Sequence, residues 1–98
     1  MSGKPYQIFM ALSAHKRYKK FDSSLQQKIQ QKASRIAEEP HRYEELKGPL
    51  RGIRSYHFEH RKTEYRIAYR ILENKNQIEI VLVKSREDFY RTLRRISR

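Results

Sequence analysis

Apolar and polar side chains alternate most clearly in two neighbouring runs, Ile53–His60 and Glu64–Leu72. Successive side chains of a β-strand point to opposite faces of its sheet, so both runs predict strands. The short connection near His60–Thr63 predicts an antiparallel hairpin. One face of this hairpin would be apolar, formed by Tyr56, Phe58, Ile67 and Tyr69. The opposite face would carry three polar residues, His57, Glu59 and Arg66.

Two further runs predict strands on either side of this hairpin in the sequence. Tyr6–Leu12 alternates with a period of two, and Gln77–Lys84 is almost continuously apolar. A strand that is apolar on both faces is usually covered on both, so Gln77–Lys84 is expected in the centre of the sheet. A turn signal at Asn74–Asn76 separates it from the hairpin.

Apolar residues at helical spacing predict three helices. A short one covers Ala14–Lys20, and a long one begins near Asp22–Ser24 and ends at Glu39 before Pro40. The last one covers Arg86–Ser97. Ser13 is the predicted N-cap of the first helix and Ser85 that of the last. Asp22, Ser23 and Ser24 are the candidate N-caps of the long helix, Ser23 in a capping-box pattern with Gln26.

The resulting order β-α-α-β-β-β-α predicts an α+β fold. Its last three strands, joined by short turns, should form an antiparallel meander with the helices on one face of the sheet. The face left open would be the one with His57, Glu59 and Arg66. No linker or internal repeat interrupts the 98 residues, so a single domain over residues 1–98 is expected.

Charge adds a prediction about the partner. The chain has 23 Lys and Arg against 11 Asp and Glu, a net charge of +12, and this excess favours an acidic partner, most often a nucleic acid. Cysteine is absent, which excludes disulfides and Cys-based zinc sites. No apolar run is long enough for a membrane span or a convincing signal peptide, so a cytoplasmic protein without membrane contact is expected. His57 and His60 should point to opposite faces of one strand, so no metal site and no cofactor are expected.

The polar face of the hairpin carries groups suited to phosphodiester chemistry. An imidazole titrates close to neutral pH, so His57 can serve as base or acid, and Glu59 can orient it or act as base itself. The guanidinium forks of Arg66 and Arg86 match phosphate oxygens. Tyr90 can donate a proton or stack on a nucleobase.

Each of these residues also has a structural interpretation. Arg66 can pair with Glu59 or Glu79 across strands. Tyr90 can anchor the last helix in the core beside Phe89. Lys47 and Glu44 can form no more than a solvated pair in the loop His41–Gly52.

Three segments, in this element order, carry a resemblance to a known family: Leu46-Lys47-Gly48, Tyr65-Arg66-Ile67-Ala68-Tyr69 and Ser85-Arg86-Glu87-Asp88-Phe89-Tyr90. From about Tyr6 to Leu93 the chain resembles the RelE/ParE toxin superfamily of type II toxin–antitoxin systems. The resemblance implies a RelE-like fold and a metal-independent, ribosome-dependent endoribonuclease that cuts mRNA in the ribosomal A site. It also implies a cognate acidic antitoxin, RelB-like, in a hetero-oligomeric complex.

The resemblance assigns roles by position. Arg66 matches the arginine that RelE-like enzymes use at the scissile phosphate, and Arg86 and Tyr90 match the arginine and the aromatic or histidine residue near their C-terminus. Six further cations would bind mRNA, ribosomal RNA or the antitoxin: Lys47, Arg51, Arg54, Arg61, Lys62 and Lys84. Contacts of this kind give affinity without sequence choice.

The general base stays open between His57, Glu59 and Glu44. Glu44 falls where YoeB-like members have their proposed general base, and Lys47 matches a loop lysine of the same members. His57 falls where a YafQ-like branch has a catalytic histidine. RelE itself has lysines at the positions of His57 and Glu59, so the residue set of this chain is mixed.

Two other functions fit the same fold. ParE-type toxins bind and poison DNA gyrase without cutting RNA. A non-catalytic nucleic-acid-binding module, such as a decayed toxin, would bind in a salt-sensitive way and show no toxicity.

Overall fold

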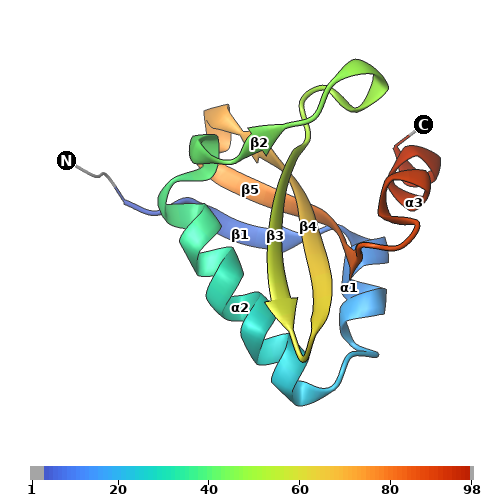
Figure 1. The fold of residues 1–98 in the computed structure, drawn as a ribbon. Helices are drawn as coiled ribbons and strands as arrows, with labels where there is room; N and C mark the ends of the chain where they lie inside the picture. The colour runs from blue at the N-terminus through green and yellow to red at the C-terminus, as the bar shows by residue number, and fades with distance from the viewer. Residues whose placement is uncertain (1–3, 98) are drawn as a thin grey trace.

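The computed structural model describes residues 4–97, which form a five-stranded mixed sheet with three helices (Figure 1). In chain order the elements are β1 (Gln7–Met10), α1 (Leu12–Tyr18), α2 (Ser23–Glu38), β2 (Glu44–Glu45), β3 (Arg54–His60), β4 (Thr63–Leu72), β5 (Gln77–Ser85) and α3 (Phe89–Ile96). Single 3-10 turns follow α2, β2 and β4, at Pro40–Arg42, Gly48–Leu50 and Glu73–Lys75. The predicted α+β class and element order are confirmed. None of the helices within residues 4–97 combines the length and apolar character needed to cross a bilayer.

The strands β3 and β4 form the predicted hairpin. Its register places His57 opposite Arg66 and Tyr56 opposite Ile67. The turn residues Arg61 and Lys62 both have positive φ angles, 51° and 66°, as a tight two-residue hairpin turn requires. Directly opposed residues share a face, so His57 and Arg66 lie together as predicted.

The strand β5 lies between β1 and β4, which confirms its predicted central position. Its pairing with β4 shifts at a β-bulge: Tyr69 lies opposite Ile80, whereas Ala68 lies opposite Leu82. Val81 is therefore the extra residue, and it changes which side chains of β5 face which side of the sheet.

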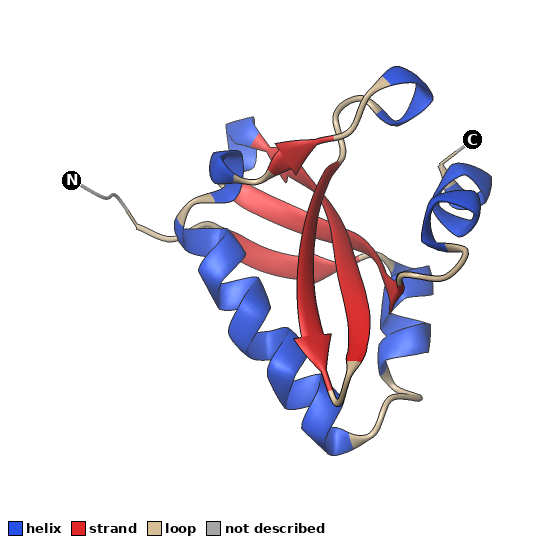
Figure 2. Ribbon diagram, in the orientation of Figure 1, coloured by secondary structure: helices blue, strands red, loops and turns tan. Residues whose placement is uncertain are grey.

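The two outer strands were not expected in their observed positions. β1 pairs in parallel with β5, from Gln7 opposite Gln77 to Met10 opposite Ile80, so the sheet is mixed. β2 lies inside the segment predicted as a loop and adds two residues beside β3 at the other edge. The sheet order is β1-β5-β4-β3-β2 (Figure 2).

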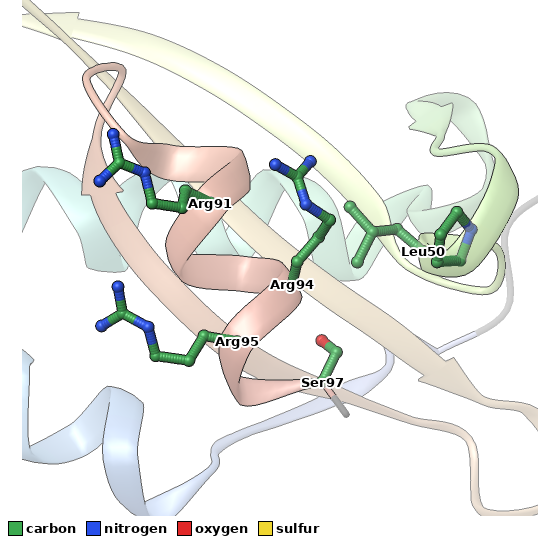
Figure 3. A pocket seen from close by; sticks show the side chains of 6 residues that line it. Leu50, Arg91, Arg94, Arg95 and Ser97 are labelled. Atoms are coloured by element: carbon green, nitrogen blue, oxygen red, sulfur yellow. The ribbon is translucent and has the colours of Figure 1, made fainter.

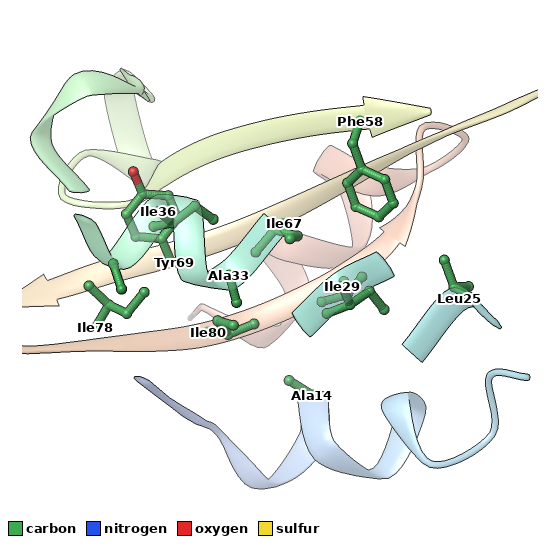
Figure 4. Close-up of a cluster of buried hydrophobic side chains, with 12 residues drawn as sticks. Ala14, Leu25, Ile29, Ala33, Ile36, Phe58, Ile67, Tyr69, Ile78 and Ile80 are labelled. Atoms are coloured by element: carbon green, nitrogen blue, oxygen red, sulfur yellow. The ribbon is translucent and has the colours of Figure 1, made fainter. Parts of the chain in front are cut away.

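The helices α1 and α2 cover one face of the sheet. The apolar stripe of α2 packs with Ala14 of α1 on inward side chains of the sheet (Figure 4). The predicted apolar face of the hairpin is confirmed, because all four of its residues belong to this cluster or pack against it: Tyr56, Phe58, Ile67 and Tyr69.

The helix α3 lies on the opposite face. A second buried cluster joins Phe89 and Leu93 of α3 to Ala68 of β4, to Leu82 of β5 and to residues of the loop after β2. Ala68 alternates with the inward residues of the first cluster along β4, so the two clusters lie on opposite sides of the sheet. The predicted coverage of one face therefore describes α1 and α2, and α3 is the exception.

The start of α1 differs from the prediction, whereas that of α2 agrees with it. α1 begins at Leu12, after Ala11 as N-cap and without a side-chain cap, so Ser13 does not cap it and Leu12 is not in a strand. Of the three candidate N-caps of α2, the structure selects Asp22, whose carboxylate accepts the backbone N–H of Leu25 at 2.9 Å. The pKa of the Asp22 carboxyl lies below its ordinary value, chiefly because of this hydrogen bond.

The start of α3 also differs from the prediction. Ser85 is the last residue of β5, and the helix begins at Phe89 after an N-cap, Asp88, in the left-handed region at φ 58°. Glu87 and Asp88 therefore precede the first turn and do not lie within it. The physical reason is tertiary, because the backbone N–H of Arg86 still donates to the sheet.

A single buried hydroxyl joins the sheet to the end of α2. Tyr69 is fully buried, and its hydroxyl donates to the carbonyl of Pro40 at 2.6 Å. Burial raises the pKa of this phenol, which keeps the donor proton in place. We expect Tyr69→Phe to lower the free energy of unfolding by about 1–2 kcal/mol, because the Pro40 carbonyl loses its partner.

Urea unfolding measures this loss. Tyr56→Phe is the matched control, since its hydroxyl has no hydrogen-bond partner within residues 4–97, and its effect should stay below about 0.5 kcal/mol. Equal losses in the two variants would show that the Pro40 contact contributes nothing.

Candidate functional site

Arg66 lies at the centre of the candidate site, on the face of β4 opposite α2. Its Nη1 donates to the hydroxyl of Tyr90 at 2.7 Å, and its guanidinium carbon lies 5.5 Å from the centre of that ring. Its Nη2 lies 3.0 Å from Oε2 of Glu64. Its Nε is buried and has no hydrogen-bond partner within residues 4–97. The guanidinium is thus fixed by two neighbours, and 22% of the side chain remains exposed.

Glu64 is a site residue that the sequence interpretation missed. Besides Arg66, its carboxylate lies 3.7 Å from Nη1 of Arg86 and 3.9 Å from Nδ1 of His57. The alternation rule could have found it, since Glu64 is two positions before Arg66 and therefore on the same face of β4.

His57 lies directly across from Arg66 and is largely exposed. Glu59 lies opposite Glu64 on the same face, and its side chain forms no hydrogen bond or ion pair with any residue from 4 to 97. The carboxylate beside His57 is therefore that of Glu64, and the structure does not show Glu59 orienting the imidazole.

The structural interpretation of Arg66 is corrected in its detail. Arg66 pairs with neither Glu59 nor Glu79, since Glu79 lies 3.6 Å from Arg70. Its ionic partner is Glu64, on its own strand.

Arg86 and Tyr90 reach the hairpin from the segment after β5. The backbone N–H of Arg86 donates to the carbonyl of Glu64 at 2.9 Å, which extends the pairing of β4 and β5 by one bond. Tyr90 lies in the first turn of α3 and is 37% exposed, whereas the adjacent Phe89 is fully buried. Phe89 is therefore the core anchor of α3, and Tyr90 holds Arg66.

A shallow groove of about 280 Å³ runs beside Arg66 along β2 and β3. It is lined by Arg42, Tyr43, Glu44, Ser55, Tyr56, His57 and Arg66. The groove brings together Glu44, His57 and Arg66, three residues singled out on separate grounds. Two of the candidate bases therefore open into one space.

Arg54, one of the predicted RNA-binding cations, is occupied within the protein. Its Nη1 donates to the carbonyls of His41 at 3.2 Å and Tyr43 at 2.6 Å, and its Nη2 lies 3.6 Å from Glu45. These contacts hold the connection between α2 and β2 against β3.

The other predicted RNA-binding cations are more accessible. Arg61 lies 3.6 Å from Asp22, and Lys84, opposite Arg66 in β5, donates to the carbonyl of Glu87 at 2.9 Å. Three are exposed, and their side chains form no hydrogen bond or ion pair in the described part of the chain, namely Lys47, Arg51 and Lys62.

His60 does not join His57. Its Nε2 lies 3.3 Å from the hydroxyl of Ser24, which comes from α2 on the other face of the sheet. Across residues 4–97, no three His, Asp or Glu side chains gather as metal ligands would.

A separate cavity of about 450 Å³ lies between α3 and the 3-10 turn after β2. Three arginines of α3 line it, with Leu50 facing them from the turn (Figure 3): Arg91, Arg94 and Arg95. None of the predicted catalytic residues contributes to its lining.

The fold is shared with solved toxin structures. A double arginine-to-alanine variant of the Escherichia coli toxin RelE in the free state has a TM-score of 0.75 at 20% identity, covering 95% of this chain and 96% of that chain. A chain of the RelBE2 toxin–antitoxin complex from Mycobacterium tuberculosis has a TM-score of 0.71 at 26% identity, covering 85% and 100%. The archaeal RelE–RelB complex from Pyrococcus horikoshii gives 0.58 at 16% identity, covering 86% and 98%. These likenesses confirm the RelE-like fold.

Sequence comparison extends this likeness. A search among curated proteins finds no match to this chain. A family model described as the ParE-like toxin of type II bacterial toxin–antitoxin systems matches residues 8–94, a span that includes Arg66, Arg86 and Tyr90. The chain therefore belongs to the ParE-like toxin family, within the RelE/ParE superfamily of type II toxins.

Proposed function

We propose that this toxin is a metal-independent endoribonuclease that cleaves mRNA on the ribosome and so stops translation. The observation that carries the proposal is the guanidinium of Arg66, fixed between Tyr90 and Glu64 and directly across from His57. A planar fork of N–H donors matches phosphate oxygens, and an imidazole moves protons near neutral pH.

In the proposed reaction the 2′-oxygen of a ribose attacks the adjacent phosphorus, and the bond from phosphorus to the 5′-oxygen breaks. A base removes the proton of the 2′-hydroxyl, and an acid protonates the leaving 5′-oxygen. The products are a 2′,3′-cyclic phosphate and a 5′-hydroxyl. Each proton-transfer step is worth roughly 10²–10⁴ in rate, and a donor to the developing charge about 10²–10³.

The residues of the site divide these tasks. Arg66 and Arg86 would stabilise the crowded phosphorane, which carries two negative charges. His57 would be the base, with Glu44 in the same groove as the second candidate. Tyr90 accepts a hydrogen bond from Arg66, so its own O–H proton stays free for the leaving oxygen.

The partners follow from charge. We propose that the exposed cations hold mRNA and ribosomal RNA in the A site, in the cytoplasm where ribosomes work. An acidic, RelB-like antitoxin would neutralise the toxin in a hetero-oligomer. The net charge of +12 supports this, and several similar structures are toxin–antitoxin complexes. Co-expression with a small acidic protein encoded next to the toxin should restore growth, and the two proteins should purify together.

Primer extension on ribosome-bound mRNA tests the activity. We expect discrete cleavage sites when purified toxin and ribosomes are both present, and none with the same mRNA alone. Absence of cleavage on ribosomes would contradict the proposal.

Gyrase inhibition is the second candidate, favoured by the ParE-like description of the family. A supercoiling assay run in parallel separates the two activities. Inhibition of supercoiling without mRNA cleavage would assign the toxin to the gyrase-directed class. Neither effect, together with salt-sensitive RNA binding, would indicate a non-catalytic protein.

A further inference from the structure

The carboxylate of Glu64 lies where Arg66, Arg86 and His57 converge. Oε2 lies 3.0 Å from Nη2 of Arg66 and 3.9 Å from Nδ1 of His57, while Oε1 lies 3.7 Å from Nη1 of Arg86. A phosphate held by the same three residues would place its oxygens in the same directions. Glu64 thus occupies, with a single negative charge, the position that the site offers to an anion.

The surroundings of Glu64 do not otherwise favour a carboxylate there. Glu59 lies directly opposite on β3, and like charges facing each other across strands are destabilising. A cavity of about 610 Å³ opens beside the hairpin turn, and Glu59, Glu64 and Glu87 all line it. The two arginine contacts are what hold Glu64 inward, and the cavity gives the side chain room to turn outward.

We propose that Glu64 is an internal competitor for the scissile phosphate. In the RNA-free toxin its carboxylate pairs with Arg66 and Arg86, and a bound phosphodiester displaces it. This inference rests on the phosphate site proposed above. It adds that Glu64 weakens binding of the substrate and acts through Arg66.

Competition by Glu64 should weaken binding of the substrate more than binding of the transition state. The phosphodiester of the substrate carries one negative charge, as Glu64 does, and gains little by replacing it. The phosphorane carries two and gains more from the same cations. Interactions that are stronger in the transition state than in the ground state raise the rate of the chemical step, so Glu64 would raise KM at little cost in kcat.

RNA binding by Glu64→Gln tests the inference. The probe is a single-stranded RNA oligonucleotide with every ribose 2′-O-methylated, which cannot be cleaved, and fluorescence anisotropy gives its Kd. Ion pairs this exposed each contribute a factor of about 1.5 to 5, so the loss of the two arginine pairs should tighten binding about fivefold. A structural role for Glu64 predicts the opposite sign.

Glu87→Gln is the matched control. It removes the same charge from the same cavity, and its side chain forms no ion pair within residues 4–97. Its Kd should change by less than about twofold. If Glu64→Gln failed to fold, Glu64→Asp would withdraw the carboxylate from Arg66 and should also tighten binding.

A double variant shows whether the effect passes through Arg66. Adding Glu64→Gln to Arg66→Ala should give no further gain in affinity, because the competed group is gone. A gain that persists without Arg66, or a Glu64→Gln variant that binds no tighter than Glu87→Gln, overturns the inference. If Glu64→Gln binds more tightly through Arg66 while the unmodified toxin cleaves no ribosome-bound mRNA, the nuclease proposal fails and the role of Glu64 stands.

Discussion

Arg66→Ala should abolish growth arrest and lower the rate of cleavage of ribosome-bound mRNA by about 10²–10³-fold. The guanidinium is the one group of the proposed site held by both α3 and β4, through Tyr90 and Glu64. Arg66→Lys keeps the charge but loses the fork, so it should recover only part of the rate. Single-turnover primer extension measures the chemical step directly.

A neighbouring arginine provides the control for this prediction. Arg70 lies on the same strand, is exposed and pairs with Glu79 at 3.6 Å, away from the site. Arg70→Ala removes the same charge and should leave growth arrest unchanged. Full toxicity of Arg66→Ala would mean that the phosphate does not bind at this guanidinium.

His57→Ala should lower the cleavage rate by roughly 10²–10⁴-fold, the range for removal of a general base or acid. It should also remove the pH dependence that an imidazole gives to the rate near neutrality. The side chain is 68% exposed, so the variant should unfold at nearly the same urea concentration as the unmodified toxin. A pH–rate profile of single-turnover cleavage is the measurement.

Glu44→Gln decides between the two bases of the groove. Glu44 is exposed on β2 and lines the same space as His57. If His57 is the base, Glu44→Gln should retain most of the activity. The reverse result, an active His57→Ala and an inactive Glu44→Gln, would assign the base to Glu44.

The elements that the sequence predicts well are those with a local pattern. Alternation identified both strands of the hairpin and the faces of His57 and Arg66, because period two is a property of each strand alone. The parallel pairing of Gln7 with Gln77 depends on residues distant along the chain, and no local pattern encodes it. The two residues of β2 are too few to show any alternation.

In the candidate site too, local patterns predict some features and tertiary structure decides the others. The approach of Tyr90 to Arg66 depends on the direction in which α3 leaves the sheet. That direction is set in part by Asp88 in a left-handed conformation, which periodicity does not reveal. Ser85 offered an N-cap pattern, but pairing of Arg86 with Glu64 prolongs the strand and overrides it. Glu64 itself was accessible to the alternation rule.

The bulge at Val81 decides which residues of β5 lie beside Arg66 and which face the core. If the register of Tyr69 with Ile80 continued unbroken along β4, Arg66 would lie opposite Val83 and Lys84 opposite Tyr65. One extra residue therefore puts a lysine in the row of Arg66 and turns a valine into the core. Straightening the bulge with Val81 kept in the strand would exchange the two positions at once, exposing the valine and burying the lysine. Deleting Val81 would instead keep Lys84 opposite Arg66. The residue types of the candidate surface and of the interior therefore depend on the same bulge, and a shift of the strands cannot change one without the other.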